Sequence, residues 1–189
     1  MQVESLSIPD VKLIHPNRHG DARGFFQQTY VTADYIAHGI PGPFVQDNWS
    51  RSARGTLRGL HYQLNHAQAK LVHVVRGQVF DVVVDIRRGS PTFGRWLGCT
   101  LSEDDPAQLY VPRGCAHGFL VLSETADFLY KCDDYYTPGD EYSVRWDDPD
   151  IGIAWPSTDA HPRLSAKDQA APLLADVPES QLLVWPSAG

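Results

Sequence analysis

The sequence predicts an all-β protein built as an antiparallel jelly roll with short peripheral helices. Short apolar runs recur along the 189 residues, separated at roughly regular spacing by turn sequences such as RRGSP, SEDDP and TPGDE. The 14 Pro and 15 Gly residues are spread along the chain, as many short connections require. Helical periodicity is scarce. Together these features are typical of a β-sandwich or barrel.

The first predicted strand is TLRGLHYQ, residues 56 to 63, and its composition is unusual. A strand that only packs alternates Val, Ile or Phe with small polar residues, and an internal Gly weakens it. Arg58, Gly59 and His61 therefore indicate a functional strand. Strict alternation puts Arg58 and His61 on opposite faces, so a bulge at Gly59, or a position at the strand end, is needed if both serve one site.

The next segment, KLVHVVRGQVFDVVVDIR from residue 70, is predicted to form two strands joined at Gly77. In the second strand one face is purely apolar, with Phe80, Val82, Val84 and Ile86, and we expect it to be the core face. The other face carries Asp81 and Asp85 between valines. Further strands are expected at residues 96 to 101, 108 to 112, 118 to 123, 126 to 132 and 142 to 146.

Two short helices are expected at the periphery. One is TADYIAHG, residues 32 to 39, and the other is SAKDQAAPLLADV, residues 165 to 177, ended or kinked near Pro172. We expect one domain over residues 1–189, with a C-terminal tail at about 178–189.

Composition limits the classes of function. A net charge of -7 and a pI near 5.5 argue against nucleic-acid binding, which needs clustered Lys and Arg. No signal-peptide pattern is present and no apolar run approaches the ~18 residues of a membrane span, so we expect a cytoplasmic protein that binds no membrane. Three cysteines without a CxxC spacing predict neither a disulfide framework nor a structural zinc site.

The segment PRGCAHGF, residues 112 to 119, has the P-x-G-x-x-H spacing of the second cupin motif. Its turn would aim His117 into the mouth of a small barrel. The alternative is a core histidine bonded to the backbone. A metal-binding cupin also needs two more His and a carboxylate in its first motif, but His61-Tyr62-Gln63 supplies one His and no Glu follows. We therefore expect no metal site.

His61 is a candidate general base, because imidazole has an unperturbed pKa of about 6.5. Asp168 is the candidate to orient it, although Ser165 and Asp168 have the spacing of a capping box, which the residues alone favour. Tyr130 shares a strand face with Phe128 and is expected to point inward. The alternative for Tyr130 is a core tyrosine with a satisfied hydroxyl.

Three cationic side chains are further candidates. Lys70 follows His61 by nine residues, and its simplest interpretation is a solvated charge at the start of a strand. Arg23 and Arg58 are candidates for a phosphate clamp, because a guanidinium binds phosphate oxygens with two hydrogen bonds. None of the three identifies a site alone.

The motifs taken in order resemble a known family. The resemblance rests on DARGFF, QDNWSRS, LRGLHYQ, AQAKLVHVVRGQVFDVVVDIRRGSPTFG, PRGCAHGFLVLS, DFLYK, YY, WDDPDIGIAWP and LSAKDQ, from about residue 5 to about residue 175. They resemble the dTDP-4-dehydrorhamnose 3,5-epimerase family of nucleotide-sugar epimerases. The resemblance implies a homodimeric cupin jelly roll without metal or other cofactor, whose N-terminal segment reaches into the neighbouring subunit's site.

The resemblance also implies roles for individual residues. His61 would be the base, Asp168 its partner, Tyr130 the acid on the other face of the sugar, and Lys70 a neighbour of the ketone oxygen. The residues implied to hold the nucleotide diphosphate or shape the pocket are Arg23, Gln28, Gln46, Asn48, Arg58, His117 and Tyr135. The implied substrate is a dTDP-linked 4-keto-6-deoxyhexose.

The sequence departs from the family pattern at three positions. Gln28 stands where Glu is frequent, Trp49 where His is frequent and His73 where Arg is frequent. These departures bear on the choice of nucleotide and on whether C3, C5 or both are inverted. Two other classes of protein are alternatives: a non-catalytic sugar-binding jelly roll, and a metal-dependent cupin oxygenase or isomerase.

Overall fold

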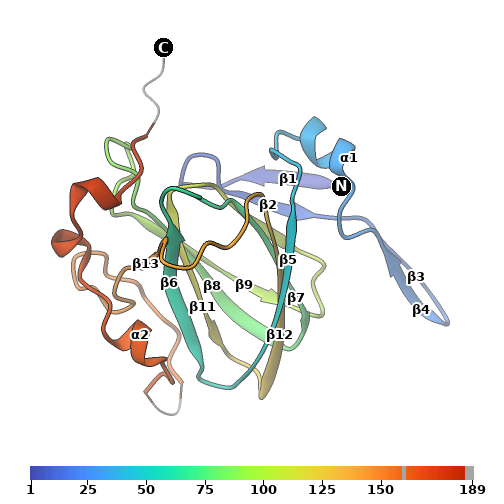
Figure 1. The fold of residues 1–189 in the computed structure, drawn as a ribbon. Helices are drawn as coiled ribbons and strands as arrows, with labels where there is room; N and C mark the ends of the chain where they lie inside the picture. Colours follow the sequence, from blue (N-terminus) through green and yellow to red (C-terminus); the bar gives the residue numbers. More distant parts are fainter. Residues whose placement is uncertain (159–160, 186–189) are drawn as a thin grey trace.

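The computed structural model describes residues 1–158 and 161–185, and two antiparallel sheets that face each other dominate it (Figure 1). The six-stranded sheet has the order β1-β2-β10-β7-β12-β5, with bounds Gln2–Ser5, Lys12–His15, Gln108–Val111, Lys70–Arg76, Thr125–Cys132 and Gln46–Ala53. The five-stranded sheet has the order β13-β6-β11-β8-β9, with bounds Glu141–Ser143, Leu57–Gln63, Cys115–Val121, Gln78–Asp85 and Trp96–Ser102. The prediction of an antiparallel jelly roll is confirmed.

The predicted strands form, with small shifts at their ends. β11 begins at Cys115 rather than at residue 118, so His117 lies inside the strand and the tight turn is at Gly114, which has a φ of +80°. β13 ends at Ser143 and is shorter than the strand predicted over residues 142 to 146.

Gly77 carries the chain from one sheet to the other, because β7 belongs to the six-stranded sheet and β8 to the five-stranded sheet. Its φ is +76°, and a Cβ there would lie 2.1 Å from the carbonyl oxygen of Thr125. Only glycine fits this crossing, which is why the break between the two predicted strands falls there.

Both faces of β8 are buried, which corrects the expectation of one core face. Val79 and Val83 pack between the two sheets, whereas Val82 and Val84 pack beneath the C-terminal segment. A strand that is covered on both faces shows no contrast between them, so alternation alone does not identify the inner one. Asp81 therefore shares the inner face with Val79 and Val83, and it is fully buried.

Both predicted helices are present but short. α1 spans Thr32–Ala37 and α2 spans Ala166–Gln169, which ends before Pro172 as the proline predicts. Two 3-10 turns follow at Leu174–Asp176 and Glu179–Gln181. Residues 186–189 of the predicted tail lie outside the described residues. No helix in the described part of the chain is long and apolar enough to cross a membrane.

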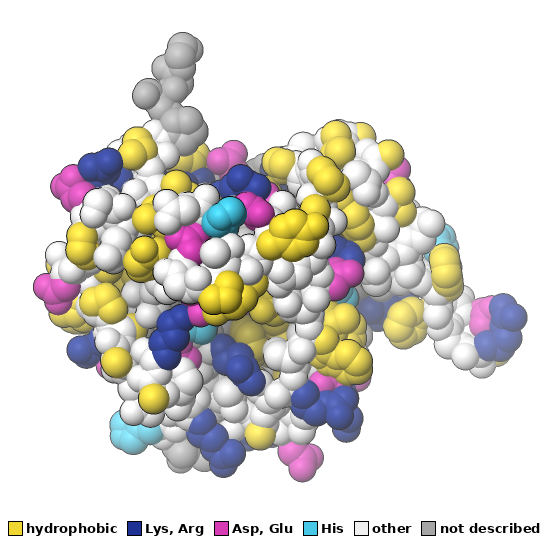
Figure 2. All heavy atoms as spheres, in the orientation of Figure 1, with side chains coloured by type: hydrophobic (Ala, Val, Ile, Leu, Met, Phe, Trp, Pro, Cys, Tyr) yellow, Lys and Arg dark blue, Asp and Glu magenta, His cyan; other side chains and the backbone are white. Residues whose placement is uncertain are grey.

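The strands before residue 54 were not predicted. β5 was missed because its inward residues include Gln46 and Asn48, which suit a strand that lines a polar cavity rather than a core. β3 (Arg18–Asp21) and β4 (Gly24–Gln27) form a hairpin that pairs with neither main sheet. We call this hairpin the arm. It stands clear of the body in Figures 1 and 2, with charged side chains at its tip.

Candidate active site

A polar site lies between the two sheets. It consists of two adjoining cavities of about 240 and 220 Å³ that share His61, Lys70, Tyr130 and Glu141. The first is also lined by Ser50, Arg58, His117, Gly118, Phe119 and Phe128, and the second by Gln46, Asn48, Tyr62, Gln63, Gln68 and Tyr136. We call them together the interior cavity. Lys and Arg side chains stand around a hollow on this face of the molecule (Figure 2).

A bulge in β6 brings Arg58 and His61 to the same cavity. His61 is opposite His117 on β11, but Arg58 is opposite Phe119, so β6 holds one residue more than its partner between these pairs. Gly59 has a φ of +130°, and a Cβ there would lie 2.6 Å from the Cα of Gly118. The predicted bulge at Gly59 is therefore confirmed, and the close approach of the two backbones requires glycine.

His61 and Asp168 form a close pair in which Nε2 of the imidazole lies 2.5 Å from Oδ1 of the carboxylate. The His61 side chain is 28% exposed and that of Asp168 is 3% exposed. Burial favours a higher pKa for Asp168, but the hydrogen bond and charge of His61, with donors from Ser165 and Gly59, hold the pKa below its ordinary value. Because an ionised carboxylate only accepts hydrogen bonds, Nε2 carries a proton, and in the neutral imidazole Nδ1 is the nitrogen with the lone pair.

The α2 segment shows how Asp168 fulfils both interpretations of the sequence. Ser165 is the N-cap, and its hydroxyl accepts a hydrogen bond of 3.1 Å from the backbone N–H of Asp168. The Asp168 carboxylate points to His61, whereas a full capping box would turn it back to the backbone of Ser165. The N-cap therefore fixes where the helix begins, and the helix directs the Asp168 carboxylate toward His61.

Tyr130 faces the cavity from β12, on the side that alternation with Phe128 predicts. Burial raises the pKa of Tyr130, Cys132 and Glu141 add to the effect, and Arg58 opposes it. No hydrogen bond within residues 1–158 and 161–185 contributes to this shift, so the alternative of a core tyrosine with a satisfied hydroxyl does not describe the structure. The phenol is protonated at neutral pH and has a proton to donate.

Lys70 begins β7 and lines both parts of the cavity, so it is not the solvated charge of the simplest interpretation. Burial lowers the pKa of its ammonium, while Cys132 and the carboxylates of Glu141 and Asp81 oppose the shift. Lys70 therefore places its amino group in a partly desolvated space, where a positive charge acts more strongly on a nearby negative charge than it would in water.

His117 faces the same cavity from β11 and is bonded to a carboxylate rather than to the backbone. Its Nε2 lies 2.9 and 3.0 Å from the two carboxylate oxygens of Asp81. Both side chains are buried. No cluster of three or more His, Cys, Asp and Glu within the described residues is arranged to hold a metal ion.

Comparison with known proteins finds similarity over nearly the whole chain. Residues 5–176 match the family model described as dTDP-4-dehydrorhamnose 3,5-epimerase. The protein of that name from Pseudomonas aeruginosa is 53% identical over 177 residues, which cover 93% of this chain and 97% of the relative. The one from Salmonella typhimurium is 51% identical over 176 residues, which cover 92% and 96%. The chain belongs to the dTDP-4-dehydrorhamnose 3,5-epimerase family.

Solved structures of other epimerases have the same fold as this protein. The dTDP-6-deoxy-D-glucose-3,5-epimerase of Legionella pneumophila, in complex with dTDP-4-keto-L-rhamnose, has a TM-score of 0.96 and 48% identity, covering 98% of this chain and 99% of its own. A double mutant of a 3'-monoepimerase from Streptomyces bikiniensis, in complex with dTDP, has a TM-score of 0.89 and 38% identity, covering 96% and 92%. The protein is therefore an enzyme of the isomerase class.

Besides His117, three of the predicted binding residues of the epimerase line the interior cavity. Arg58 Nε donates a 3.0 Å hydrogen bond to the hydroxyl of Ser52. Gln46 Nε2 donates to Asn48 Oδ1 at 3.0 Å, and Gln46 Oε1 accepts from the backbone N–H of Tyr136 at 2.8 Å. These bonds give the polar wall on β5 a fixed arrangement.

Three other predicted binding residues lie outside the cavity within a single chain. Tyr135 is 63% exposed, and its neighbour Tyr136 lines the cavity instead. Arg23 is at the tip of the arm, where its side chain is 89% exposed. Gln28 follows the arm and is also exposed. One chain does not bring these residues to His61.

The departures from the family pattern also lie outside the interior cavity. Trp49 is 67% exposed and alternates along β5 with Asn48, which faces inward. His73 alternates along β7 with Val72, which belongs to the core between the sheets. Neither side chain replaces a group that lines the cavity.

Sequence reasoning missed two carboxylates of the epimerase. Glu141 Oε1 lies 4.0 Å from Nδ1 of His61, and the same side chain pairs with the ammonium of Lys167. Its signal was its position beside a predicted strand that pairs with β6, since Ser143 is opposite His61. The signal for Asp81 was an ionisable residue within an apolar strand, where carboxylates are disfavoured.

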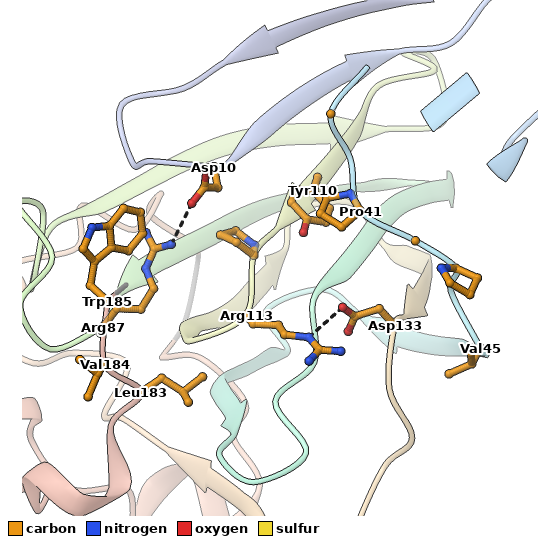
Figure 3. Close-up of a pocket in the computed structure, with 14 residues that line it drawn as sticks. Asp10, Pro41, Val45, Arg87, Tyr110, Arg113, Asp133, Leu183, Val184 and Trp185 are labelled. Atoms are coloured by element: carbon orange, nitrogen blue, oxygen red, sulfur yellow. Dashed lines mark hydrogen bonds and ion pairs between the residues drawn. The ribbon is translucent and has the colours of Figure 1, made fainter. Parts of the chain in front are cut away.

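A larger cavity, of about 610 Å³, lies apart from these residues, between the loop before β5, the turn after β10 and the C-terminal segment (Figure 3). Its guanidinium groups are already paired, Arg113 with Asp133 at 2.9 Å and Arg87 with Asp85 at 2.8 Å. The Arg87 guanidinium also lies 4.1 Å from the ring centre of Trp185. No histidine among the described residues lines this cavity, so the interior cavity is the candidate active site.

Proposed function

We propose that this epimerase inverts C3, C5 or both carbons of a dTDP-linked 4-keto-6-deoxyhexose in rhamnose-type deoxysugar biosynthesis. The observation that carries the proposal is the 2.5 Å contact between His61 and Asp168 in a cavity that Tyr130 and Lys70 also line. The Legionella pneumophila relative bound to dTDP-4-keto-L-rhamnose supports the class of substrate.

His61 is the proposed general base. Nδ1 takes the proton from the carbon next to the C4 carbonyl, and the electron pair of that C–H bond forms a carbon–carbon double bond as charge moves to O4. Asp168 stabilises the imidazolium that results, since it already accepts the hydrogen bond from Nε2. A base of this kind typically contributes about 10²- to 10⁴-fold to the rate.

Tyr130 is the proposed acid on the opposite face of the sugar. Its hydroxyl gives a proton to the enolate carbon, the carbonyl at C4 re-forms, and the phenolate and imidazolium later exchange protons with water. The Lys70 ammonium stabilises the negative charge on O4 while the enolate exists. A positioned donor of this kind contributes on the order of 3 kcal/mol. The bonds broken and formed balance without a redox or metal cofactor.

The nucleotide diphosphate is proposed to bind along β5 and β6. Arg58 offers a guanidinium at the edge of the cavity, and Gln46 and Asn48 offer amides on the opposite wall. A guanidinium suits two adjacent phosphate oxygens because its N–H groups form a planar fork. His117 and Tyr135 are proposed to shape the pocket.

We further propose a homodimer in which the arm of one subunit completes the site of the other. Phe25 and Phe26 on the arm are 65% and 67% exposed, and Trp49 at the sheet edge is 67% exposed. Such large apolar side chains on a projecting hairpin favour burial against a second surface. The arm would then bring Arg23 and Gln28 to the partner's cavity. We assign the dimer to the cytoplasm, which suits its three free thiols.

Mixing inactive variants tests the arrangement of the arm. If Arg23 acts on the neighbouring site, a dimer of one Arg23→Ala chain and one His61→Ala chain has one intact site. Random exchange of subunits should then restore about a quarter of the wild-type activity, because half of the dimers are mixed and half of their sites are intact. A mixture no more active than the two variants alone would show that Arg23 serves its own chain or none.

Incubation with dTDP-4-keto-6-deoxyglucose in D₂O tests the reaction itself. Deuterium at C3 and C5 shows that both carbons are deprotonated, and deuterium at C3 alone identifies a 3-epimerase. Binding of the nucleotide sugar without deuterium at either carbon would support the non-catalytic jelly roll. Loss of activity with EDTA, restored by a divalent metal, would support the metal-dependent cupin.

A further inference from the structure

Asp81 is a buried ionisable group beside the interior cavity that no step above uses. It lies on the inner face of β8 and is fully buried, so it does not line the cavity itself. Burying a carboxylate costs free energy unless hydrogen bonds and opposite charges offset that cost. An apolar residue would fill the position more favourably, so the carboxylate needs a reason to be there.

His117 is the hydrogen-bonding partner of Asp81. Nε2 lies at nearly equal distances from the two carboxylate oxygens, 2.9 and 3.0 Å, so a single N–H is shared between them. Lys70 acts on Asp81 through its charge but forms no ion pair with it within the part of the chain that the structure describes. The effect of Asp81 on the cavity therefore passes first through the imidazole.

The ring of His117 is held on two sides. The carboxylate fixes the Nε2 edge, and the ring stacks on Phe128 with a centroid separation of 6.0 Å and an interplanar angle of 29°. The nearly equal distances to two acceptor oxygens suit one N–H that is shared between them, so the proton of the imidazole lies on Nε2 and Nδ1 is the remaining polar atom. His117 lines the interior cavity, and its Nε2 is already taken by Asp81.

We infer that Asp81 is a positioning residue that fixes the ring and the tautomer of His117 toward the interior cavity. Its carboxylate holds the proton on Nε2, so that Nδ1 meets the sugar as an acceptor in a defined place. This inference rests on the proposed function for its consequence in catalysis, but the tautomer of His117 is a property of the protein alone.

Asp81→Asn is the informative change, because it keeps the shape of the side chain and removes the charge. An amide offers His117 either an oxygen or an N–H group, so it no longer dictates which ring nitrogen carries the proton. ¹⁵N NMR of histidine-labelled protein should show the Nε2–H tautomer of His117 in the wild type and a mixture of tautomers in the variant. A His117 tautomer that is the same in both proteins would overturn the inference.

Steady-state kinetics give the second measurement. Asp81→Asn should lower kcat roughly 10- to 100-fold, as removal of carboxylates that orient functional histidines does elsewhere, with little change in KM. In the His117→Ala background the same change should have almost no further effect. Effects that multiply in the double variant would show that Asp81 does not act through His117 and would also overturn the inference.

Asp148→Asn is a matched control, because Asp148 is 2% exposed and its carboxylate accepts hydrogen bonds from the backbone of Asp150 and Leu174, away from the cavity. It should leave kcat and the His117 signals unchanged. If the wild type fails to turn over the nucleotide sugar, the proposed function fails. The NMR comparison still decides the tautomer in that case.

Discussion

Two histidine–aspartate pairs share the interior cavity, and they are built differently. His61 and His117 are directly opposite each other on the neighbouring strands β6 and β11. The His61 side chain is 28% exposed, and its partner Asp168 is delivered by a helix from the far end of the chain. The His117 side chain is 7% exposed, and its partner Asp81 lies on the adjacent strand β8 of the same sheet.

The two carboxylates also differ in their electrostatics. Burial acts to raise the pKa of both, but for Asp168 the hydrogen bonds of His61, Ser165 and Gly59 outweigh burial and the pKa is lowered. For Asp81 burial outweighs His117 and Lys70, and the pKa is raised. The more exposed His61–Asp168 pair, which we call the open pair, thus suits proton transfer to and from a substrate. The buried His117–Asp81 pair, which we call the closed pair, suits fixed orientation.

The largest expected effect comes from removing the base of the open pair. His61→Ala should lower the rate of deuterium exchange at both carbons by at least about 100-fold, because it removes the imidazole that is proposed to take the proton. The measurement is deuterium incorporation into dTDP-4-keto-6-deoxyglucose. Thermal unfolding and dTDP binding are the controls, and both should be close to wild type. Exchange near the wild-type rate would remove His61 as the base.

The opposite face of the sugar is tested by Tyr130→Phe. The variant keeps its base and the ring that packs beside Phe128, but it lacks the hydroxyl, so the enolate is reprotonated by His61 on the original face or slowly by water. Inversion should fall on the order of 100-fold, and exchange should fall much less. Both quantities are measured in the same tube. If inversion and exchange fall by the same factor, Tyr130 is a structural residue and not the acid.

Asp168→Asn should have a smaller effect than His61→Ala, because the imidazole remains but loses the charge that orients it. We expect kcat to fall roughly 10- to 100-fold, about as far as for Asp81→Asn. The two variants should differ when each is combined with His61→Ala. Adding Asp168→Asn to His61→Ala should lower the exchange rate no further, whereas adding Asp81→Asn should still lower it. Double-variant kinetics, scored on residual exchange, check this independence. If the effects of Asp81→Asn and His61→Ala on the exchange rate do not multiply, the two pairs act as one network.

The two pairs also differ in how far the sequence predicts them. His61 stood out as an odd residue in a strand, and spacing pointed to Asp168 as a cap, but only the family resemblance joined residues 107 positions apart. Local pattern carries no information about which distant helix packs against a strand. A bulge at Gly59 was one of the two predicted arrangements, with a position at the strand end, that could bring Arg58 and His61 to one site, and the structure shows the bulge.

The closed pair was only half predicted. The turn and spacing of PRGCAHGF indicated that His117 points into the barrel, but Asp81 was placed opposite the expected core face. β8 is covered by the second sheet on one side and by the C-terminal segment on the other, so apolar residues occur on both of its faces. The sequence therefore does not show which face lies between the sheets, and only the fold does. The strands of the arm and β5 were missed for a related reason: their residues suit solvent, a ligand or a partner rather than a core.

The smallest expected effect is on stability, and the two pairs should respond with opposite sign. The pKa of Asp168 is lowered in the folded state, so this carboxylate stabilises the fold above the ordinary pKa of about 4, and that contribution is lost as the pH falls through the folded value. Asp168→Asn should therefore unfold more easily at pH 7, by on the order of 1 kcal/mol, and the difference from the wild type should shrink toward pH 3.

Asp81 has a raised pKa, so its ionised form opposes folding once the pH exceeds the folded value, and protonation relieves that cost as the pH falls. The charged and titratable groups that face it are His117 on β11, Lys70 on β7 and Cys99, its opposite residue on β9. Because Asn carries no charge, Asp81→Asn removes the cost of burying the ionised carboxylate and should be as stable as the wild type, or more stable, at pH 7. Urea unfolding of both variants from pH 3 to pH 8 makes the comparison. If both variants lose stability equally at pH 7, the two carboxylates play the same structural part, and the distinction between an open and a closed pair fails.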